Sequence, residues 1–513
     1  MIAAVRTALA PFGYEQLHTI RVSDSFRRLK GSPWDALKSR GDESVSDHYE
    51  KYMTAGDQLR AKMKRNDAAL LPALTALLAK RAELTGDQSG RTWSDNTAYL
   101  LDSLKTPEEI AVLRSIYGPR VVVIAAYAPR TARVEELVEQ INRDTLAQRE
   151  DSDARSKAEH IVRRDEIGQQ DDPYGQNVGG AFPHADLIVA TKDDADVRYQ
   201  VQRFIDLVFG SLEHTPTRME QGMYLAKTAA LRSSAMSRQV GAAILTEDGQ
   251  VLSLGTNEAP KPGGGAYWSD AEPDNRTFSL ESDPSVLMRD RLMANLMMNL
   301  KRAGWHVPEN VQQSEDTDQL IKEALDAFRQ WEADQRSSGK TVTVLAEDII
   351  EFYREVHGEM MAITDAARRG VSLQDQRLFT TTFPCHDCAK HIVASGLAGV
   401  IFLEPYPKSL VKELHPDAIR IDGEGSPELR KVDFDTFVGV APRRYASFFQ
   451  SGRRPKKGTF DRSTSKMRLG EYEDPGLNVD LEWYDPHASI RREELVLGDL
   501  KRTFERATGE QLQ

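Results

Sequence analysis

The chain has 513 residues, of which 40% are hydrophobic and 28% are charged, and its formal net charge is −12. This composition is typical of a globular protein of about three domains at roughly 150 residues each, with no apolar run near the ~20 residues that span a bilayer. An acidic chain does not favour binding to a polyphosphate backbone, which depends on clustered Lys and Arg. The stretch RRYASFFQSGRRPKKG (443–458) is a basic exception, and it is either a solvated loop or a phosphate contact. Its two cysteines exclude a disulfide framework, and its first residues lack the features of a secretory signal. We therefore expect a cytoplasmic protein with no membrane partner.

Residues 1–212 are predicted to form a first α/β domain. The runs RVVVIAAYAP (120–129) and ADLIVAT (185–191) are apolar and β-branched, and they have the length of buried strands. The stretch TPEEIAVLRSIYG (106–118) is predicted to be a helix, because it opens with a capping-box pattern and closes with glycine. Strands that alternate with helices favour a parallel sheet with crossover helices.

Residues 213–513 are predicted to form a second domain. After an amphipathic helix (218–237), the segments SRQVGAAIL and QVLSLGTN are joined by Asp-Gly, which predicts a β-hairpin. Regular structure is excluded from NEAPKPGGGAYW by its density of Pro and Gly. A helical insertion is then expected over about 270–345.

The second domain continues with a long helical pattern from Leu345 through EVHGEMMAITDAARRG. The stretch RLFTTTF (377–383) is predicted to be a strand, PCHDCAKHIVASGL (384–397) a helix and AGVIFLEPYP (398–407) a strand. A strand, helix and strand of these lengths favour a right-handed parallel crossover.

The cysteines of the chain, Cys385 and Cys388, lie in one C-x-x-C motif. Such a motif occurs in redox pairs of the thioredoxin kind. It also forms half of structural zinc sites, which take four protein ligands, and two of the three ligands in catalytic zinc sites.

An upstream motif decides between these interpretations. His357 and Glu359 supply a third ligand and a carboxylate, and Pro384 precedes the first cysteine, so the chain contains H-x-E…P-C-x-x-C in that order. This is the signature of zinc-dependent deaminases, in which the glutamate moves protons and does not bind the metal. We expect one Zn²⁺ per chain, with one coordination position open for a water molecule whose pKa the metal lowers. Glu359 is placed to carry protons to N3 and to the leaving amine of cytosine.

A resemblance to a known family is carried by several segments of the second domain. The segments HGEMMAITDAARRG, TTTFPCHDCAKHIVASGL and VIFLEPYPKSL resemble the dCMP-deaminase branch of the cytidine deaminase superfamily. The segment SRQVGAAILTEDGQVLSLGTNEAPKPGGG is similar to the first hairpin and substrate loop of that branch.

Segments of the first domain extend the resemblance. LDSLKTPEEIAVLRSIYG, VVVIAAYAPR and YGQNVGGAFPHADLIV resemble the N-terminal P-loop-kinase-like domain of bacterial anti-phage dCTP deaminases. The implied fold is a P-loop-NTPase-like parallel-sheet domain followed by a cytidine-deaminase-like three-layer α/β/α domain with a helical insertion. The similarity covers roughly Leu100 to Phe449.

The resemblance implies zinc-dependent deamination of free dCTP, dCMP or both, which drains the dCTP pool during phage replication. It also implies a homo-oligomer such as a hexamer, Mg²⁺ as a companion of the triphosphate, and a regulatory RNA or protein partner. Zinc ligation by His357, Cys385 and Cys388 and proton transfer by Glu359 carry over from the family.

Five further residues are candidates for substrate contacts on the strength of this resemblance. Asn257 matches a position that hydrogen-bonds the deoxyribose, and Lys261 and Lys408 are candidate phosphate contacts. Arg238 either reaches a phosphate or is a surface charge. Tyr406 either lines the base pocket or packs in the core.

One departure from the family concerns the first domain. The sequence contains no G-x-x-x-x-G-K-[ST] loop, whose backbone N–H groups and Lys would hold phosphates. We therefore expect a regulatory or interaction role for the first domain, without kinase activity.

Two other functions stay open at the level of sequence. A polynucleotide deaminase would act on a flipped cytosine or adenine, although no aromatic and basic stacking platform is recognised in the sequence. A binding protein with a structural zinc would not need the carboxylate of Glu359.

Overall fold

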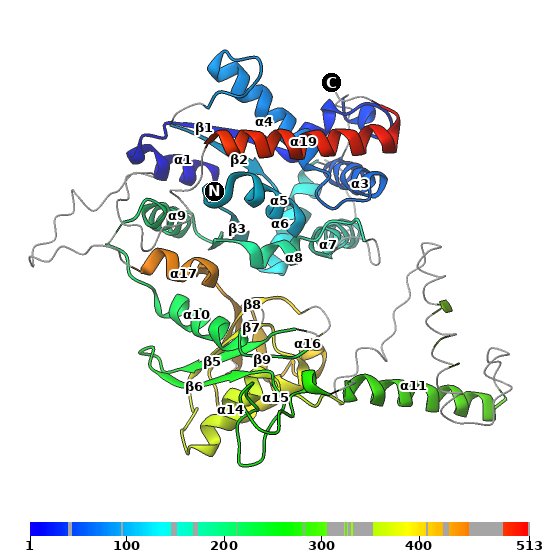
Figure 1. Cartoon of the computed structure of the whole chain (residues 1–513), viewed down its shortest axis with the longest axis vertical. Coiled ribbons are helices and arrows are strands. Elements are labelled where there is room, and N and C mark those ends of the chain that lie inside the picture. Colours follow the sequence, from blue (N-terminus) through cyan, green and yellow to red (C-terminus); the bar gives the residue numbers. More distant parts are fainter. Residues whose placement is uncertain are drawn as a thin grey trace, which may run out of the picture. The chain divides into compact units, whose positions relative to one another are not determined.

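The computed structural model divides the chain into two compact units, residues 1–220 with 438–513 and residues 221–437. Each unit is described by itself (Figure 1). The structure describes the whole chain apart from 39–43, 94–95, 145–150, 168–172, 212, 237, 281–282, 305–351 (in which 323, 326, 330 and 331 are described), 407–408, 424–429, 451–485 and 511–513. Among the described residues, no helix is long and apolar enough to cross a membrane.

The first unit contains parallel strands covered by helices. Its strands are β1 (Gln16–Arg21), β2 (Thr97–Asp102), β3 (Ile124–Tyr127), β4 (Leu187–Ala190) and β11 (Gly439–Val440). Its helices are α1 (Ile2–Leu9), α2 (Val22–Ser25), α3 (Val45–Met63), α4 (Leu70–Thr85), α5 (Pro107–Tyr117), α6 (Arg130–Asp144), α7 (Asp151–Ile167), α8 (Val178–Ala181), α9 (Asp194–Val208), α17 (Pro442–Phe449) and α19 (Pro486–Thr508).

The described strands of the first unit form two sheets and not the single sheet that we predicted. β1 pairs with β2 and β3 pairs with β4, both in parallel, while β11 joins β4 in the antiparallel direction. The predicted strands at 120–129 and 185–191 correspond to β3 and β4, and the predicted helix at 106–118 corresponds to α5. The capping box of α5 is present, with the Thr106 hydroxyl accepting from the N–H of Glu109 and the Glu109 carboxylate accepting from the N–H of Thr106.

The C-terminal part of the chain returns to the first unit, so the structure divides the chain differently from the predicted 213–513 domain. The Arg81 guanidinium of α4 and the Glu493 carboxylate of α19 form a buried ion pair at 2.8 Å. Leu497, Leu500 and Phe504 of α19 are buried in the same apolar core as α4. Buried apolar area and a paired buried charge therefore hold α19 on this unit.

The second unit contains a mixed sheet with strand order β6-β5-β7-β8-β10-β9. Its strands are β5 (Gly241–Leu245), β6 (Val251–Thr256), β7 (Arg377–Thr382), β8 (Gly399–Glu404), β9 (Ile419–Ile421) and β10 (Val432–Thr436). Its helices are α10 (Arg218–Ala230, which begins in the first unit), α11 (Pro284–Arg302), α14 (Gly358–Arg368), α15 (His386–Ala394) and α16 (Val411–Leu414).

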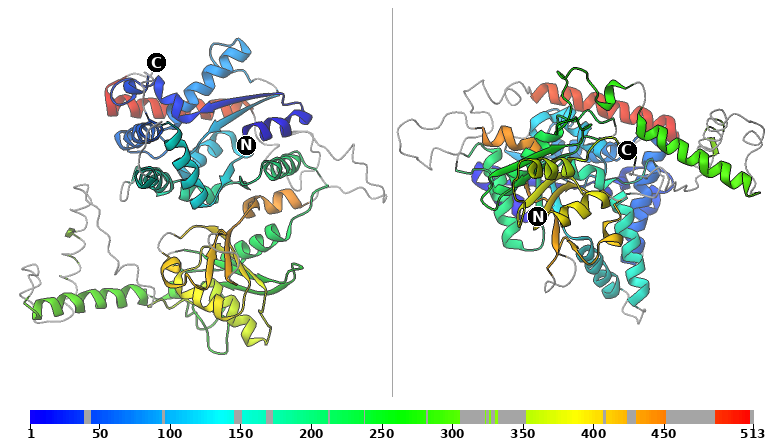
Figure 2. Two further views of the ribbon diagram at one scale, coloured as in Figure 1. Left: turned by 180° about the vertical axis from the view of Figure 1, so that it is seen from behind. Right: turned by 90° about the horizontal axis from the view of Figure 1, so that it is seen from below.

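The sheet of the second unit lies between two layers of helices (Figures 1 and 2). On one face, α10 packs so closely that a Cβ at Gly241 would lie 2.1 Å from the carbonyl oxygen of Ala226. On the other face, Ala242 of β5 shares a buried cluster with Ala362 of α14 and Ile392 of α15. The described part of this unit therefore has the predicted three-layer α/β/α arrangement.

The local predictions for the second unit are mostly confirmed. β5 and β6 form an antiparallel hairpin, and Gly249 in its turn has a positive φ of 85°. β7 and β8 are parallel and α15 connects them. Of the predicted insertion over 270–345, α11 is described and most of the rest lies outside the described residues.

Two helices of the second unit begin or end elsewhere than predicted. α10 ends at Ala230 and not at 237. Of the helix predicted from Leu345, residues 345–351 lie outside the described residues. Residues 352–357 are not helical, and α14 begins at Gly358, because Val356 forms an antiparallel β-bridge with Glu258. This bridge holds the backbone before α14 in an extended conformation, so the zinc-ligand candidate His357 is the N-cap residue and not part of the helix.

Candidate metal centre

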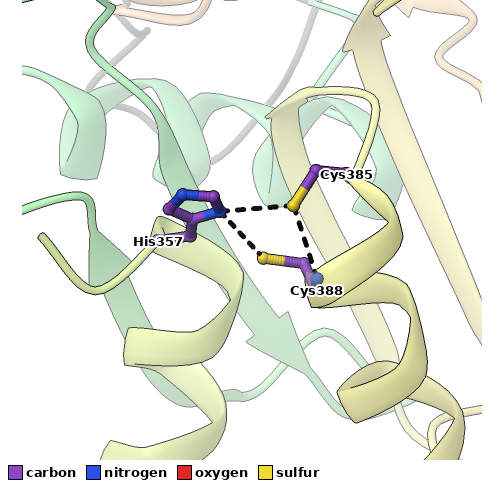
Figure 3. Close-up of side chains that lie close together, drawn as sticks. All are labelled: His357, Cys385 and Cys388. Carbon is purple, nitrogen blue, oxygen red and sulfur yellow. Dashed lines mark hydrogen bonds between the residues drawn. The ribbon is translucent and has the colours of Figure 1, made fainter. Parts of the chain in front are cut away.

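Three side chains from two helix N-termini meet in the second unit (Figure 3). His357 is the N-cap of α14, Cys385 is the N-cap of α15, and Cys388 lies in the first turn of α15. Their ligand atoms all lie within 4.8 Å of one another. Residues far apart in the sequence thus reach one point because both helices start on the same face of the sheet.

The distances between the ligand atoms fit a zinc ion. His357 Nδ1 lies 3.3 Å from Cys385 Sγ and 3.4 Å from Cys388 Sγ. A tetrahedral Zn²⁺ with its usual bonds to sulfur and nitrogen would place such atoms about 3.5 Å apart. Two thiolates and one imidazole leave a fourth position for water or substrate, which is the arrangement of catalytic zinc sites.

The fourth member of the motif, Glu359, lies beside the thiols in the first turn of α14. Its side chain is buried, and its Oε2 accepts a hydrogen bond from Cys388 Sγ at 3.6 Å. Burial, with the Cys385 thiolate nearby, raises the pKa of the Glu359 carboxyl. A carboxyl with a raised pKa in contact with the ligands is suited to take and return a proton near neutral pH.

The metal-free ligands have unequal proton affinities. Hydrogen bonds from Cys388 and His357 lower the pKa of the Cys385 thiol to about 4, although burial opposes this. The hydrogen bond to Cys385 raises the pKa of Cys388 well above its usual value. Burial alone would lower the pKa of His357, but its interactions with Cys385 raise it to about 9. Without metal and near neutral pH, these shifts favour a thiolate at Cys385, an imidazolium at His357 and a thiol at Cys388.

The predicted substrate residues are placed as follows. Asn257 Oδ1 accepts from the N–H of Val240 and its Nδ2 donates to the carbonyl of Arg238, both at 2.7 Å, so this side chain fixes the entry to β5. Lys261 is exposed in the Gly-rich loop. Lys408 lies outside the described residues.

Two of the predicted substrate residues lie together. The guanidinium of Arg238 is 5.9 Å from the ring centroid of Tyr406. Tyr406 is half-buried against the apolar cluster that contains Cys385 and Cys388. This pair therefore combines a cation with an aromatic ring that packs against the cluster containing two of the ligand candidates.

Two residues at the site were missed in the sequence analysis. The hydroxyl of Thr380, which is fully buried on β7, donates to Glu359 Oε1 at 3.2 Å. The ring of Tyr353 lies edge-on to that of His357, with centroids 5.5 Å apart. The alternation of strand residues in RLFTTTF puts Thr380 on the same face as Leu378, which is the signal that could have identified it.

A family comparison concerns the residues that form this metal centre. Residues 216–404 match the family model of the cytidine and deoxycytidylate deaminase zinc-binding region. This part of the chain is therefore similar to that region. The match spans both halves of the motif that meets at the metal centre, and its zinc-binding character agrees with the His357, Cys385 and Cys388 cluster.

Three known proteins that are similar to parts of this chain are named deoxycytidylate deaminase or probable deoxycytidylate deaminase. The deoxycytidylate deaminase of Enterobacteria phage T4 is 27% identical over 188 residues, which is 36% of this chain and 78% of that protein. The phage T2 enzyme is 42% identical over 55 residues, 11% of this chain and 29% of its own. A probable deoxycytidylate deaminase of Drosophila melanogaster is 36% identical over 94 residues, which is 17% of this chain and 45% of that protein.

Among solved structures, the dCMP deaminase of cyanophage S-TIM5 in its apo form is 15% identical, with a TM-score of 0.21, over 43% of this chain and 99% of that chain.

Proposed function

We propose that the second unit is a deaminase domain, which catalyses the hydrolytic deamination of free deoxycytidine nucleotides, dCMP, dCTP or both, to the uracil nucleotides. The observation that carries this proposal is the contact of Glu359 with Cys388, 3.6 Å from Oε2 to Sγ, at a cluster of one imidazole and two thiols. A structural zinc site needs no such buried carboxylate beside its ligands.

The chain divides the chemical task between its residues. His357, Cys385 and Cys388 would hold the zinc ion, which supplies an acidified water at its open position. Glu359 accepts a proton from the water, delivers one to N3 of the cytosine and passes another to the exocyclic amine. As the C4–O bond forms, the C4–N bond weakens, and it breaks when the amine leaves as ammonia.

Two neighbouring side chains hold the carboxylate of Glu359 in place. Thr380 on β7 donates to one oxygen of Glu359, and the thiol of Cys388 lies against the other. Because both carboxylate oxygens have a partner, the carboxylate is oriented before substrate arrives, which reduces the reorganisation needed in the transition state.

A substrate comparison tests the proposal. Purified protein is incubated with dCMP, dCTP and cytosine-containing single-stranded DNA, and uracil formation is followed in each, with Glu359→Gln as the matched control. The proposal predicts turnover of a mononucleotide by the wild-type protein and none by the variant. Uracil in the DNA but in neither mononucleotide would favour a polynucleotide deaminase and would overturn it.

The wider role also belongs to this proposal. The sequence resemblance supports depletion of dCTP during phage infection, restrained by a first unit of P-loop-kinase-like ancestry that has lost phosphate binding and contacts a regulatory RNA or protein. Assembly into a homo-oligomer and Mg²⁺ bound to a triphosphate substrate have the same support. Nucleotide pools measured in expressing cells before and after phage challenge test this role, because a dCTP pool that does not fall more than in cells with Glu359→Gln would contradict it.

A further inference from the structure

Glu258 is a buried glutamate two residues beyond β6, and only 1% of its surface is exposed. Its Oε2 accepts hydrogen bonds from the N–H of Ser234 at 3.0 Å and from the hydroxyl of Ser234 at 2.6 Å. Its Oε1 accepts from the N–H of Ala259 at 2.9 Å. Burial of a carboxylate is costly unless donors satisfy it, so these bonds fix the carboxylate and the backbone at Ser234 to each other.

The backbone of Glu258 leads to the metal centre. Its N–H donates to the carbonyl of Val356 at 3.3 Å, and its carbonyl accepts from the N–H of Val356 at 3.1 Å. Val356 directly precedes the ligand candidate His357. Glu258 therefore contacts the segment before the metal ligand through its backbone and the segment around Ser234 through its side chain.

The segment between α10 and β5 carries Arg238, and its described residues form no helix or strand. The guanidinium of Arg238 lies 5.9 Å from the ring centroid of Tyr406. Asn257 holds the end of this segment, at the carbonyl of Arg238 and the N–H of Val240. A Cβ on Gly358 would lie 3.1 Å from the carbonyl oxygen of Val240, so the segment ends against the first turn of α14. Without regular structure, its position depends on such side-chain contacts.

We propose that Glu258 is a positioning residue for the nucleotide, an inference that rests on the proposed function. Its carboxylate fixes the segment that carries Arg238 relative to the backbone that carries His357. A cation for the phosphate and the ligand set for the zinc are thereby held at a constant separation, which suits the two ends of one deoxycytidine nucleotide. Glu258 acts through Arg238 and not on the reacting atoms.

Kinetics with dCMP and dCTP test this role. Glu258→Gln keeps the size of the side chain but replaces one acceptor oxygen by an NH2 group, which then faces an N–H of Ser234 or of Ala259. We expect KM for the nucleotide to rise about 10-fold with a smaller change in kcat, because Arg238 would bind the phosphate in the ground state and the transition state alike. Glu247→Gln, which alters an exposed glutamate in the turn between β5 and β6, is the matched control and should keep the wild-type values.

A double-mutant cycle separates positioning from a general loss of stability. If Glu258 acts through Arg238, Glu258→Gln should cause little further rise of KM in protein that already carries Arg238→Gln. A purely structural role would lower kcat/KM by the same factor in both backgrounds, and that result would overturn the proposal. An unchanged KM in Glu258→Gln alone would also overturn it.

Hydrogen exchange of the same full-length variants supplies a measurement that needs no turnover. The amides between α10 and β5 should exchange faster in Glu258→Gln than in the wild-type protein or in Glu247→Gln, while those of β8 should be unchanged. Unchanged exchange between α10 and β5 would overturn the proposal. Faster exchange there, in a protein that turns over no nucleotide, would support the hold of Glu258 on this segment and would overturn the proposed function alone.

Discussion

Replacing Thr380 by valine tests how the second unit holds Glu359, the proposed proton carrier. Valine keeps the shape and burial of threonine but removes the hydroxyl that donates to Glu359 Oε1. A hydrogen bond to a charged group contributes about 1.5–3 kcal/mol. The bond is long at 3.2 Å, and the same hydroxyl also lies 3.1 Å from the carbonyl of Thr382, so we expect a contribution at or just below the lower end of this range. We expect kcat/KM to fall roughly 5- to 12-fold, which corresponds to about 1–1.5 kcal/mol.

The pH profile of the Thr380 variants separates this role from a general packing role. The bond from Thr380 lowers the pKa of Glu359 against the effect of burial, so its loss raises that pKa further. The acid limb of kcat/KM should therefore move to higher pH in Thr380→Val, with the largest loss at low pH. Thr380→Ser keeps the hydroxyl and should keep the wild-type limb. An unchanged limb in Thr380→Val, or equal losses in both variants, would refute this reasoning.

Three further predictions concern protonation and stability. Zinc added to metal-free protein at pH 7 should release about two protons, one from His357 and one from Cys388. The reason is that the pKa of His357 is raised to about 9 and the pKa of Cys388 well above its usual value. A pH-indicator dye that detects no proton release would contradict this. Glu493→Ala leaves Arg81 buried without its carboxylate partner, so it should lower the free energy of unfolding of the first unit by about 3–5 kcal/mol in urea titration. A loss below about 1 kcal/mol would show that this ion pair does not hold α19 on the first unit. Burial and two neighbouring carboxylates raise the pKa of Asp435 to about 6, so the stability contributed by its protonated form is lost as the pH rises through that value; Asp435→Asn should raise Tm at pH 7.5 but not at pH 4, and equal effects at both would contradict it.

The metal centre was predictable because its chemistry restricts the residue types. Few arrangements other than a metal site account for the pairing of His357-x-Glu359 with Pro384-Cys385-x-x-Cys388 in a chain with two cysteines. The contribution of Thr380 was not predictable in the same way, because a threonine in a strand is common and its partner comes from another element. Hydrogen bonds between distant elements leave no periodic signal in the sequence.

Long-range contacts also explain what the sequence did not indicate about the fold. Residues 352–357 were predicted to be helical, but the bridge between Val356 and Glu258 holds the backbone extended there, and no local propensity encodes that bridge. The return of α19 to the first unit depends on the pairing of Arg81 with Glu493, which are separated by 412 positions. Local signals such as the capping box of α5 were, by contrast, confirmed.

The most direct test of the central claim measures zinc content and nucleotide turnover on the same preparations of wild-type protein and Glu359→Gln. The account predicts about one zinc per chain in both, conversion of dCMP or dCTP to the uracil nucleotide by the wild type, and a loss of about 10²- to 10⁴-fold or more in the variant. Turnover by wild-type protein that contains no zinc, or undiminished turnover by Glu359→Gln, would contradict it.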